Sequence, residues 1–262
     1  MLKPGRFAAL CLLRRSVRKF MSKRVKQSVG VVFDLDGVIY KNSPDGPVVI
    51  PGTCCLDDKT CLMTALNHGE YSLYYAGIPN AIKRLNDAKI PYAFMTNGTG
   101  YTEAEKAKTI SALLRLPVNP DNVVTCTTPF RQFIQKYGKS RVLVVGGNET
   151  VRIAREYGFE DCVGLRDYVA SRRQLVPHLR APKLSGNSAG DSARPDGRKI
   201  RAIFVFSEPD DWQTAVQVMC DVLSSNGEPC EEFDGRPSQE QVVELFFSNP
   251  DFTYPASHSG DH

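Results

Sequence analysis

Two aspartates separated by one residue follow a short apolar segment near the start of the chain. The segment Val29–Phe33 is uncharged and rich in β-branched residues, which is typical of a buried parallel strand. Asp34 and Asp36 come directly after it, and Gly37 follows as a turn residue. Ligands of open α/β sheets bind beside the carboxyl ends of the strands. Because side chains i and i+2 of an extended chain point to the same side, we expect both carboxylates to face one pocket.

Two carboxylates in one pocket suggest metal-assisted chemistry. Two like charges need a cation or a shared proton, and Mg²⁺ prefers oxygen ligands and also binds phosphate. Asp34 and Asp36 are therefore candidate metal ligands. One carboxylate can act as a nucleophile while the other moves protons to and from the leaving group. An EF-hand calcium loop is a poor match, since Val38 and Ile39 stand where it needs an oxygen ligand and a glycine. A strand end with two solvated acids remains an alternative.

A second polar group follows another predicted strand, Ile90–Met95. Thr96, Asn97 and Gly98 supply a hydroxyl, an amide side chain and unobstructed backbone N–H groups, which can hold phosphate oxygens. Thr-Asn-Gly is also an ordinary turn sequence. Neighbouring strands of one parallel sheet would, however, bring these residues beside Asp34. We therefore name all three as candidate phosphate-binding residues.

The elements that must position these residues alternate along the chain. Hydrophobic periodicity, capping patterns and turn residues mark their limits. Thr102 to Glu105 form a capping-box pattern at the start of one helix, and Asn148 and Gly158 can cap the two ends of another. The predicted strands are 29–33, 90–95, 121–126, 141–145, 200–206 and 242–247, and the predicted helices are 80–88, 102–114, 130–137, 149–157 and 212–224. Residues 41–52 and 181–197 are rich in Pro, Gly and small polar residues, and we predict that both are loops. The alternation is typical of parallel α/β sheets with crossover helices.

The charge of the chain is concentrated at its N-terminus. Residues 1–29 hold nine of the 33 basic residues and no acid, which leaves 24 basic against 29 acidic residues in the remainder. A basic nucleic-acid-binding face on the folded body is therefore not expected. The Arg-rich, acid-free segment 1–28 predicts a mitochondrial transit peptide, with a disordered basic arm as the alternative. Translation from Met21 would remove most of this segment and predict a cytoplasmic protein.

Composition excludes several other classes of protein. Hydrophobic content of 42% and charged content of 24% are typical of globular proteins. The chain has no apolar run approaching the ~18–20 residues that a bilayer span needs, so stable membrane insertion is not expected. None of the eight cysteines forms a Cys-x-x-Cys pair, which argues against zinc-ribbon and thioredoxin-like sites and favours reduced thiols.

The two polar strand ends together resemble a known family. FDLDGVIY and FMTNGTG are similar to the first two motifs of the haloacid dehalogenase (HAD) superfamily, and the closest subgroup is class IIA. RVLVVGGNETVRIAREYGFED, AIFVFSEPDDWQTAVQVMCDVLSSNG and FFSNPDFTYP resemble the α/β cap of that subgroup, most of all in the mitochondrial hydrolases of the cat eye syndrome critical region protein 5 type. The resemblance covers roughly residues 29–47 and 76–255. It implies a HAD-like Rossmannoid parallel sheet with an inserted α/β cap domain.

The resemblance also implies roles for the candidate residues. Asp34 would attack phosphorus and form an aspartyl-phosphate, and Asp36 would be the general acid and base. Thr96, with the backbone after it, would hold the phosphate. The Asp34 carboxylate and the backbone carbonyl of Asp36 would bind Mg²⁺. The expected substrate is a small phosphorylated metabolite. Fungal relatives that join this domain to a phosphatidyltransferase suggest a link to glycerophospholipid metabolism, and a homodimer formed through the cap is also expected.

The sequence departs from the family pattern in two places. Residues 48–75 interrupt it, as a true insertion, a splice variant or a gene-model difference would. The chain also stops before the family's Gly-Lys-Pro lysine and its last acidic motif, so the core sheet is expected to be incomplete at the C-terminus. The alternative function is therefore a catalytically impaired isoform or fragment that serves as a binding or regulatory module. We expect a targeting segment at 1–28, the core at 29–129, the cap at 130–255 and a tail at 256–262.

Overall fold

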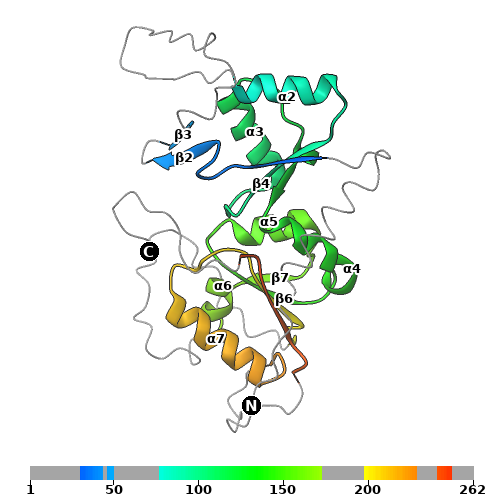
Figure 1. The fold of residues 1–262 in the computed structure, drawn as a ribbon. Helices are drawn as coiled ribbons and strands as arrows, with labels where there is room; N and C mark the ends of the chain where they lie inside the picture. Colours follow the sequence, from blue (N-terminus) through cyan, green and yellow to red (C-terminus); the bar gives the residue numbers. More distant parts are fainter. Residues whose placement is uncertain (1–29, 44–45, 50–76, 173–197, 229–240, 250–262) are drawn as a thin grey trace. The chain divides into compact units, whose positions relative to one another are not determined.

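The computed structural model describes residues 30–43, 46–49, 77–172, 198–228 and 241–249 (Figure 1). These residues fall into two compact units that divide between Thr128 and Pro129. The predicted targeting segment 1–28, the loop 181–197 and the tail 256–262 lie outside the described residues. The predicted insertion 48–75 does so too, apart from Val48 and Val49. No helix among the described residues is long and apolar enough to cross a membrane.

The first unit is built on a parallel sheet. Within the described residues its strands have the order β1-β4-β5, and a separate antiparallel hairpin joins β2 to β3. Its elements are β1 (Val31–Asp34), β2 (Tyr40–Ser43), β3 (Gly46–Val49), α2 (Gly77–Asp87), β4 (Tyr92–Thr96), α3 (Glu103–Leu114), the 3₁₀ turn η1 (Pro120–Asn122) and β5 (Val123–Thr125). Phe33 lies opposite Phe94 and Asp34 opposite Met95, so the polar strand ends are in register.

Both crossover helices of this unit pack against one face of the sheet. The connections β1-α2-β4 and β4-α3-β5 step across the sheet in the same direction, and right-handed crossovers then place their helices on the same side. One buried cluster accordingly joins Ile82 of α2 and Ile110 of α3 to Phe94 of β4. Figure 1 shows both helices beside this sheet. On β1, by contrast, Val32 is 52% exposed, because it points to the opposite face.

The hairpin corrects the prediction of a loop over residues 41–52. Asn42 lies opposite Pro47 and Lys41 opposite Val48 in an antiparallel pair. Pro and Gly predict a loop because they disfavour central strands. In a two-stranded hairpin each strand is an edge, where proline costs little, so Pro47 is tolerated here.

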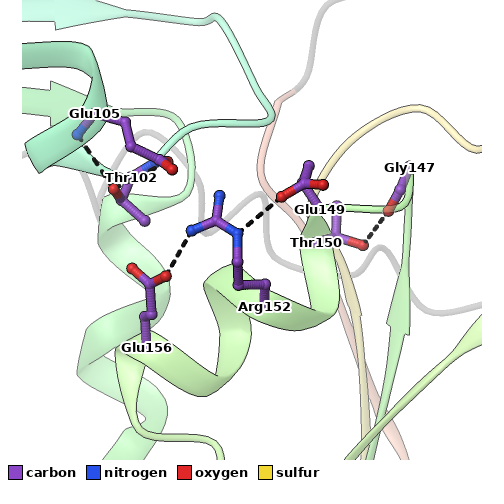
Figure 2. A network of polar contacts seen from close by, with 7 residues as sticks. All are labelled: Thr102, Glu105, Gly147, Glu149, Thr150, Arg152 and Glu156. Atoms are coloured by element: carbon purple, nitrogen blue, oxygen red, sulfur yellow. Dashed lines mark hydrogen bonds and ion pairs between the residues drawn. The ribbon is translucent and has the colours of Figure 1, made fainter. Parts of the chain in front are cut away.

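The predicted capping box at the start of α3 is confirmed (Figure 2). The Glu105 backbone N–H donates to the Thr102 hydroxyl at 3.3 Å, and the Thr102 backbone N–H donates to the Glu105 carboxylate at 2.8 Å. The reciprocal bonds satisfy two backbone donors that a helix start leaves unpaired. They fix the point at which the chain turns from the end of β4 into α3.

The second unit is also built on a parallel sheet. Within the described residues its strand order is β7-β6-β8-β9. Its elements are η2 (Thr128–Phe133), which begins one residue before the division, α4 (Ile134–Tyr137), β6 (Val142–Val145), α5 (Thr150–Tyr157), β7 (Cys162–Gly164), α6 (Leu165–Ala170), β8 (Ala202–Val205), α7 (Trp212–Ser224) and β9 (Glu244–Phe247). The predicted helix Trp212–Ser224 is confirmed at both ends. Strand β7 and helix α6 were not predicted, because the pattern of apolar residues does not mark them.

Helices cover both faces of this second sheet. Alternate residues of β6 and β8 enter two different clusters: Val144 and Phe204 pack with α4 and α5, while Leu143 and Ile203 pack with α6 and α7. Figure 1 shows the two pairs of helices on opposite sides of the sheet. A strand buried on both faces reads as a continuous apolar run, which explains the sequence VLVV of β6.

Helix α5 begins one residue later than predicted. Its N-cap is Glu149, which makes no side-chain capping bond, so the prediction that Asn148 caps this helix is wrong. The Thr150 hydroxyl donates instead to the Gly147 carbonyl at 2.7 Å (Figure 2). The predicted end at Gly158 is confirmed, with a φ of 108° that favours glycine.

An exposed ion-pair network runs along α5. The Arg152 guanidinium donates to Glu149 at 2.8 Å and to Glu156 at 2.5 Å (Figure 2). These are i,i+3 and i,i+4 spacings, and each such pair stabilises an exposed helix by about 0.2–0.5 kcal/mol. We assign this network to helix stability.

Candidate active site

The end of β1 presents two carboxylates on the face away from the buried cluster of its unit. Phe33 and Leu35 pack into that cluster, and Leu35 is 0% exposed. Asp34 and Asp36 alternate with them, Asp34 being exposed and Asp36 half-buried. The Leu35 backbone N–H donates to the Met95 carbonyl at 3.1 Å, which carries the β1–β4 ladder past Asp34. The chain thus stays close to extended between the two acids.

A tight turn after Asp36 returns the chain to the same place. The Leu35 carbonyl accepts backbone hydrogen bonds from Ile39 at 2.9 Å and Tyr40 at 3.1 Å, and the Gly37 N–H donates to the Tyr40 carbonyl at 2.8 Å. Gly37 has a φ of 80°, which a residue with a Cβ rarely adopts. The turn places Tyr40 near the acids. Burial raises the pKa of the Tyr40 hydroxyl, and the charges of Asp36 and Asp34 raise this pKa further.

The end of β4 joins this arrangement through Thr96. This residue is 1% exposed, and its hydroxyl donates a hydrogen bond to the Asp36 carboxylate. The same hydroxyl accepts the Gly98 backbone N–H at 2.8 Å. The Gly98 carbonyl in turn accepts the Cys126 thiol, which lies 3.6 Å away after β5. Three neighbouring strand ends therefore contribute to one polar cluster.

The structure thus brings three of the five predicted site residues into direct contact. Asp36, Thr96 and Gly98 form the hydrogen-bonded group. Asp34 lies two residues before Asp36 on the same face, and its carboxylate accepts the Leu35 N–H at 2.9 Å. Asn97 is exposed and directly follows β4.

This cluster also contains a buried lysine that the sequence motifs do not mark. Lys106, in the early part of α3, is 6% exposed, and its ammonium lies 5.1 Å from the ring centroids of both Tyr40 and Tyr101. A Cβ placed on Gly98 would be 3.5 Å from the Asp36 carboxylate and 3.6 Å from the Lys106 ammonium. Gly98 thus leaves a small space that a carboxylate and an ammonium both border.

The electrostatics of Lys106 follow from its burial. Burial lowers its pKa because the cation loses hydration, and the nearby Asp36 charge opposes part of this change. A signal for Lys106 does exist in the sequence. A helix N-terminus carries a positive partial charge and disfavours cations, yet this lysine comes four residues after the Thr102 cap. A basic residue placed so early in the helix that follows a predicted phosphate site could have been named as a candidate.

The donor set suits a hard cation. No group of three or more His, Cys, Asp or Glu side chains in the described part of the chain is arranged to hold a metal ion. Mg²⁺, however, commonly binds through one or two carboxylates and completes its shell with water and substrate phosphate. The exposed Asp34 carboxylate and the backbone carbonyl of Asp36 are oxygen donors of that kind. The residues present therefore fit Mg²⁺.

The fold and the site define a class of protein: a parallel α/β protein whose strand ends gather carboxylates, a hydroxyl, a glycine and a buried lysine. Residues 65–160 match the family described as haloacid dehalogenase-like hydrolase. This match includes Thr96, Gly98 and Lys106, and it begins after Asp34 and Asp36.

Two curated proteins extend the comparison. The chain is 32% identical over 183 residues to a mitochondrial hydrolase of Saccharomyces cerevisiae, covering 68% of this chain and 51% of that protein. It is 28% identical over 180 residues to a cardiolipin synthase (CMP-forming) / mitochondrial hydrolase fusion protein of Schizosaccharomyces pombe, covering 66% of this chain and 29% of that protein. The chain thus spans about half the length of the first relative and less of the second.

A solved structure has a similar fold. A hypothetical protein from Pyrococcus horikoshii OT3 superposes with a TM-score of 0.50 at 17% identity, covering 87% of this chain and 61% of the other. The chain belongs to the haloacid dehalogenase-like hydrolase family.

Proposed function

We propose that the protein is a Mg²⁺-dependent phosphohydrolase that acts on a small phosphomonoester through an aspartyl-phosphate. The observation that carries the proposal is the convergence of two strand ends, those of β1 and β4: Asp36 accepts the Thr96 hydroxyl, Thr96 accepts the Gly98 N–H, and Asp34 lies on the same face. Carboxylates beside hydroxyl and amide donors suit a phosphate held in place for nucleophilic attack.

The proposed reaction has two steps. A carboxylate oxygen of Asp34 attacks phosphorus, the bond from phosphorus to the ester oxygen breaks, and Asp36 gives a proton to that departing oxygen. Water then attacks the phosphorus of the aspartyl-phosphate, and Asp36 takes the proton from that water. Inorganic phosphate leaves and the Asp34 carboxylate is restored. Each proton that Asp36 gives is thus recovered in the second step.

The polar groups around the acids would hold the phosphate. The Thr96 hydroxyl has one proton and donates it to Asp36, so phosphate binding would redirect that proton to a phosphate oxygen. The backbone N–H of Asn97 would contribute a further donor, and the Gly98 N–H, which donates to the Thr96 hydroxyl, would turn to the phosphate in the same way. Mg²⁺, bound by the Asp34 carboxylate and the Asp36 backbone carbonyl, would neutralise negative charge on the phosphate.

We assign the two units different tasks in this proposal. The core, over residues 29–129, carries the chemistry. The α/β cap, over residues 130–255, shields the site from water and selects the substrate. A homodimer through the cap is part of the same proposal, and size-exclusion chromatography with light scattering tests it.

The test of the proposed reaction is hydrolysis of an aryl phosphate with and without Mg²⁺. The wild-type chain should release phosphate only with the metal, and Asp34→Asn should reduce the rate to background while retaining the wild-type unfolding temperature. Lys139→Met is a matched control, because this lysine is exposed and lies in the other unit. Background rates in both wild type and Asp34→Asn would contradict the proposal for this chain. That result would support the alternative, a binding or regulatory module.

We further propose a mitochondrial protein that acts on a phosphomonoester of glycerophospholipid metabolism. Two observations support this: the acid-free basic segment 1–28, and two relatives described as mitochondrial, one of them joined to cardiolipin synthase. A fluorescent reporter carrying residues 1–29 should enter mitochondria, and a cytosolic reporter would contradict the location. Hydrolysis of glycerol phosphates no faster than of unrelated sugar phosphates would contradict the lipid link.

A further inference from the structure

We propose that Lys106 is the charge-compensating residue of the phosphate site: its ammonium, which lies over two tyrosine rings, offsets the negative charge that Asp34 and a bound phosphate bring together beside Asp36. This inference rests on the proposed function and adds a residue that the family motifs quoted above do not contain. Three observations carry it: the burial of the ammonium, its restraint by the rings, and its position across the space beside Gly98.

The rings restrain the ammonium without neutralising it. Its nitrogen lies 5.1 Å from the ring centroid of Tyr40 and 5.1 Å from that of Tyr101, within the range of cation–π attraction. Tyr40 is 1% exposed, so one side of this clamp is fixed in the core. A ring attracts the cation through its quadrupole and carries no net charge, so the positive charge remains able to attract an anion.

The position of the ammonium matches the place where negative charge gathers. The Cβ position of Gly98 lies 3.0 Å from the Thr96 hydroxyl, 3.5 Å from the Asp36 carboxylate and 3.6 Å from the Lys106 ammonium. A phosphate held by the Thr96 hydroxyl and the Gly98 N–H would therefore lie close to this lysine. A buried charge acts through a lower effective dielectric constant than an exposed one, so its attraction for the phosphate is stronger.

The cost of burying this cation supports a functional role. Lys is among the residues that are least often buried, and a position early in a helix is unfavourable for a cation. Burial lowers the pKa of Lys106, so the folded protein disfavours the charged form of this side chain. A methylene stem alone would fill the same volume without that cost. The charge itself is therefore the feature that the site uses.

The test is the affinity of the full chain for inorganic phosphate in the presence of Mg²⁺, measured by isothermal titration calorimetry. Lys106→Met should weaken phosphate binding by about tenfold or more, because one charged contact to the anion is lost. Lys106→Arg keeps the charge and should stay within about threefold of wild type. Lys108→Met, an exposed lysine on the same helix, should bind phosphate as wild type does.

A second variant leaves the lysine in place. Tyr101→Leu removes the more exposed of the two rings and should weaken phosphate binding by about two- to threefold, whereas Tyr101→Phe keeps a ring and should weaken it less. Thermal unfolding of every variant shows whether the fold is retained. Folded Lys106→Met with wild-type phosphate affinity would overturn the inference, as would equal losses in the methionine and arginine variants.

The same measurements separate this inference from the proposed hydrolysis. A wild-type chain that binds phosphate but releases none from aryl phosphate would contradict the hydrolase proposal, while a loss of binding in Lys106→Met would still support the role of the lysine. Hydrolysis by the wild type with an unchanged phosphate affinity in Lys106→Met would support the hydrolase and reject the role of Lys106.

Discussion

Among the residues that the structure describes, two clusters combine a lysine ammonium, a tyrosine ring and a carboxylate, one in each unit. In the second unit, Lys136 donates to Glu244 at 2.5 Å and lies 4.9 Å from the Tyr137 ring centroid, with side chains 61% and 45% exposed for the lysine and the glutamate. In the first unit, Lys106 is 6% exposed and faces Asp36 across the space beside Gly98.

The environment gives the two lysines opposite properties. Hydrogen bonding to Glu244 raises the pKa of Lys136, whereas burial lowers the pKa of Lys106. In the exposed pair, Lys136 and Glu244 compensate each other's charge, and solvent screens their remaining electrostatic field. This pair therefore contributes to local structure. The buried lysine and Asp36 both border the space beside Gly98, which suits a site that receives a further anion. Similar residues thus form a stabilising surface ion pair in one unit and a candidate binding group in the other.

The largest effect is expected where the buried cluster is hydrogen-bonded. Thr96→Val removes a hydroxyl that serves both Asp36 and the Gly98 N–H, and urea denaturation should show a loss of about 2 kcal/mol in the free energy of unfolding. Thr109→Val is the control, because its half-buried hydroxyl donates to the Glu105 carbonyl within α3, and we expect a change within about 0.5 kcal/mol. Equal losses of unfolding free energy in both variants would show that the Thr96 hydroxyl network stabilises the fold no more than an ordinary helix hydroxyl does.

The two lysines should respond in opposite directions to the same substitution. Lys106→Met relieves the cost of burying a cation, so the free energy of unfolding should stay unchanged or rise by about 1 kcal/mol. Lys136→Met removes an exposed pair and should lower it by less than about 1 kcal/mol. Urea denaturation at neutral pH measures both. A loss above about 2 kcal/mol in Lys106→Met would mean that Lys106 also stabilises the fold, which would contradict the proposed difference between the two lysines.

The space between Asp36 and Lys106 can be filled without moving either residue. Gly98→Ala places a Cβ 3.0 Å from the Thr96 hydroxyl and should weaken phosphate binding several-fold, with a change in stability below about 1 kcal/mol. Gly100→Ala meets open space, but its φ of 85° disfavours a Cβ, so it should cost about 1 kcal/mol and leave phosphate affinity unchanged. Calorimetry measures the phosphate affinity of both variants, and urea denaturation measures their stability. Weaker phosphate binding in Gly100→Ala but not in Gly98→Ala would show that phosphate does not use the space beside Gly98.

The smallest effect is expected from the pH dependence of the exposed cluster. Burial opposes ionisation of Glu244, but hydrogen bonds from Lys136 and Tyr137 outweigh it and lower the pKa of this carboxyl. A group whose folded pKa is depressed stabilises the protein above its unfolded pKa and loses that contribution as the pH falls through the folded pKa. Glu244→Gln should therefore destabilise by less than about 1 kcal/mol near pH 7, and the difference should vanish near pH 3. A difference that persists in acid would exclude this ion pair as its source.

Local patterns predicted several elements of the fold because their causes lie within a few residues. The capping box at Thr102 and the helix Trp212–Ser224 depend on neighbouring side chains and periodicity, and both are confirmed. Asn148 does not cap α5, because the helix begins at Thr150, whose hydroxyl and backbone N–H both donate to the Gly147 carbonyl. The hairpin of β2 and β3 was missed because Pro47 reads as a loop residue until its strand is known to be an edge.

The sequence by itself determined which groups could do chemistry, since Asp34, Asp36, Thr96 and Gly98 follow apolar runs whose carboxyl ends a parallel sheet must align. The tertiary structure alone decided that Thr96 bonds Asp36, which is 60 residues away, and that Lys106 meets them. A lysine on a helix carries no sign of burial in its spacing. Its environment arises only when Tyr40 from one turn and Tyr101 from another close over it, because long-range packing sets the solvation of a charge.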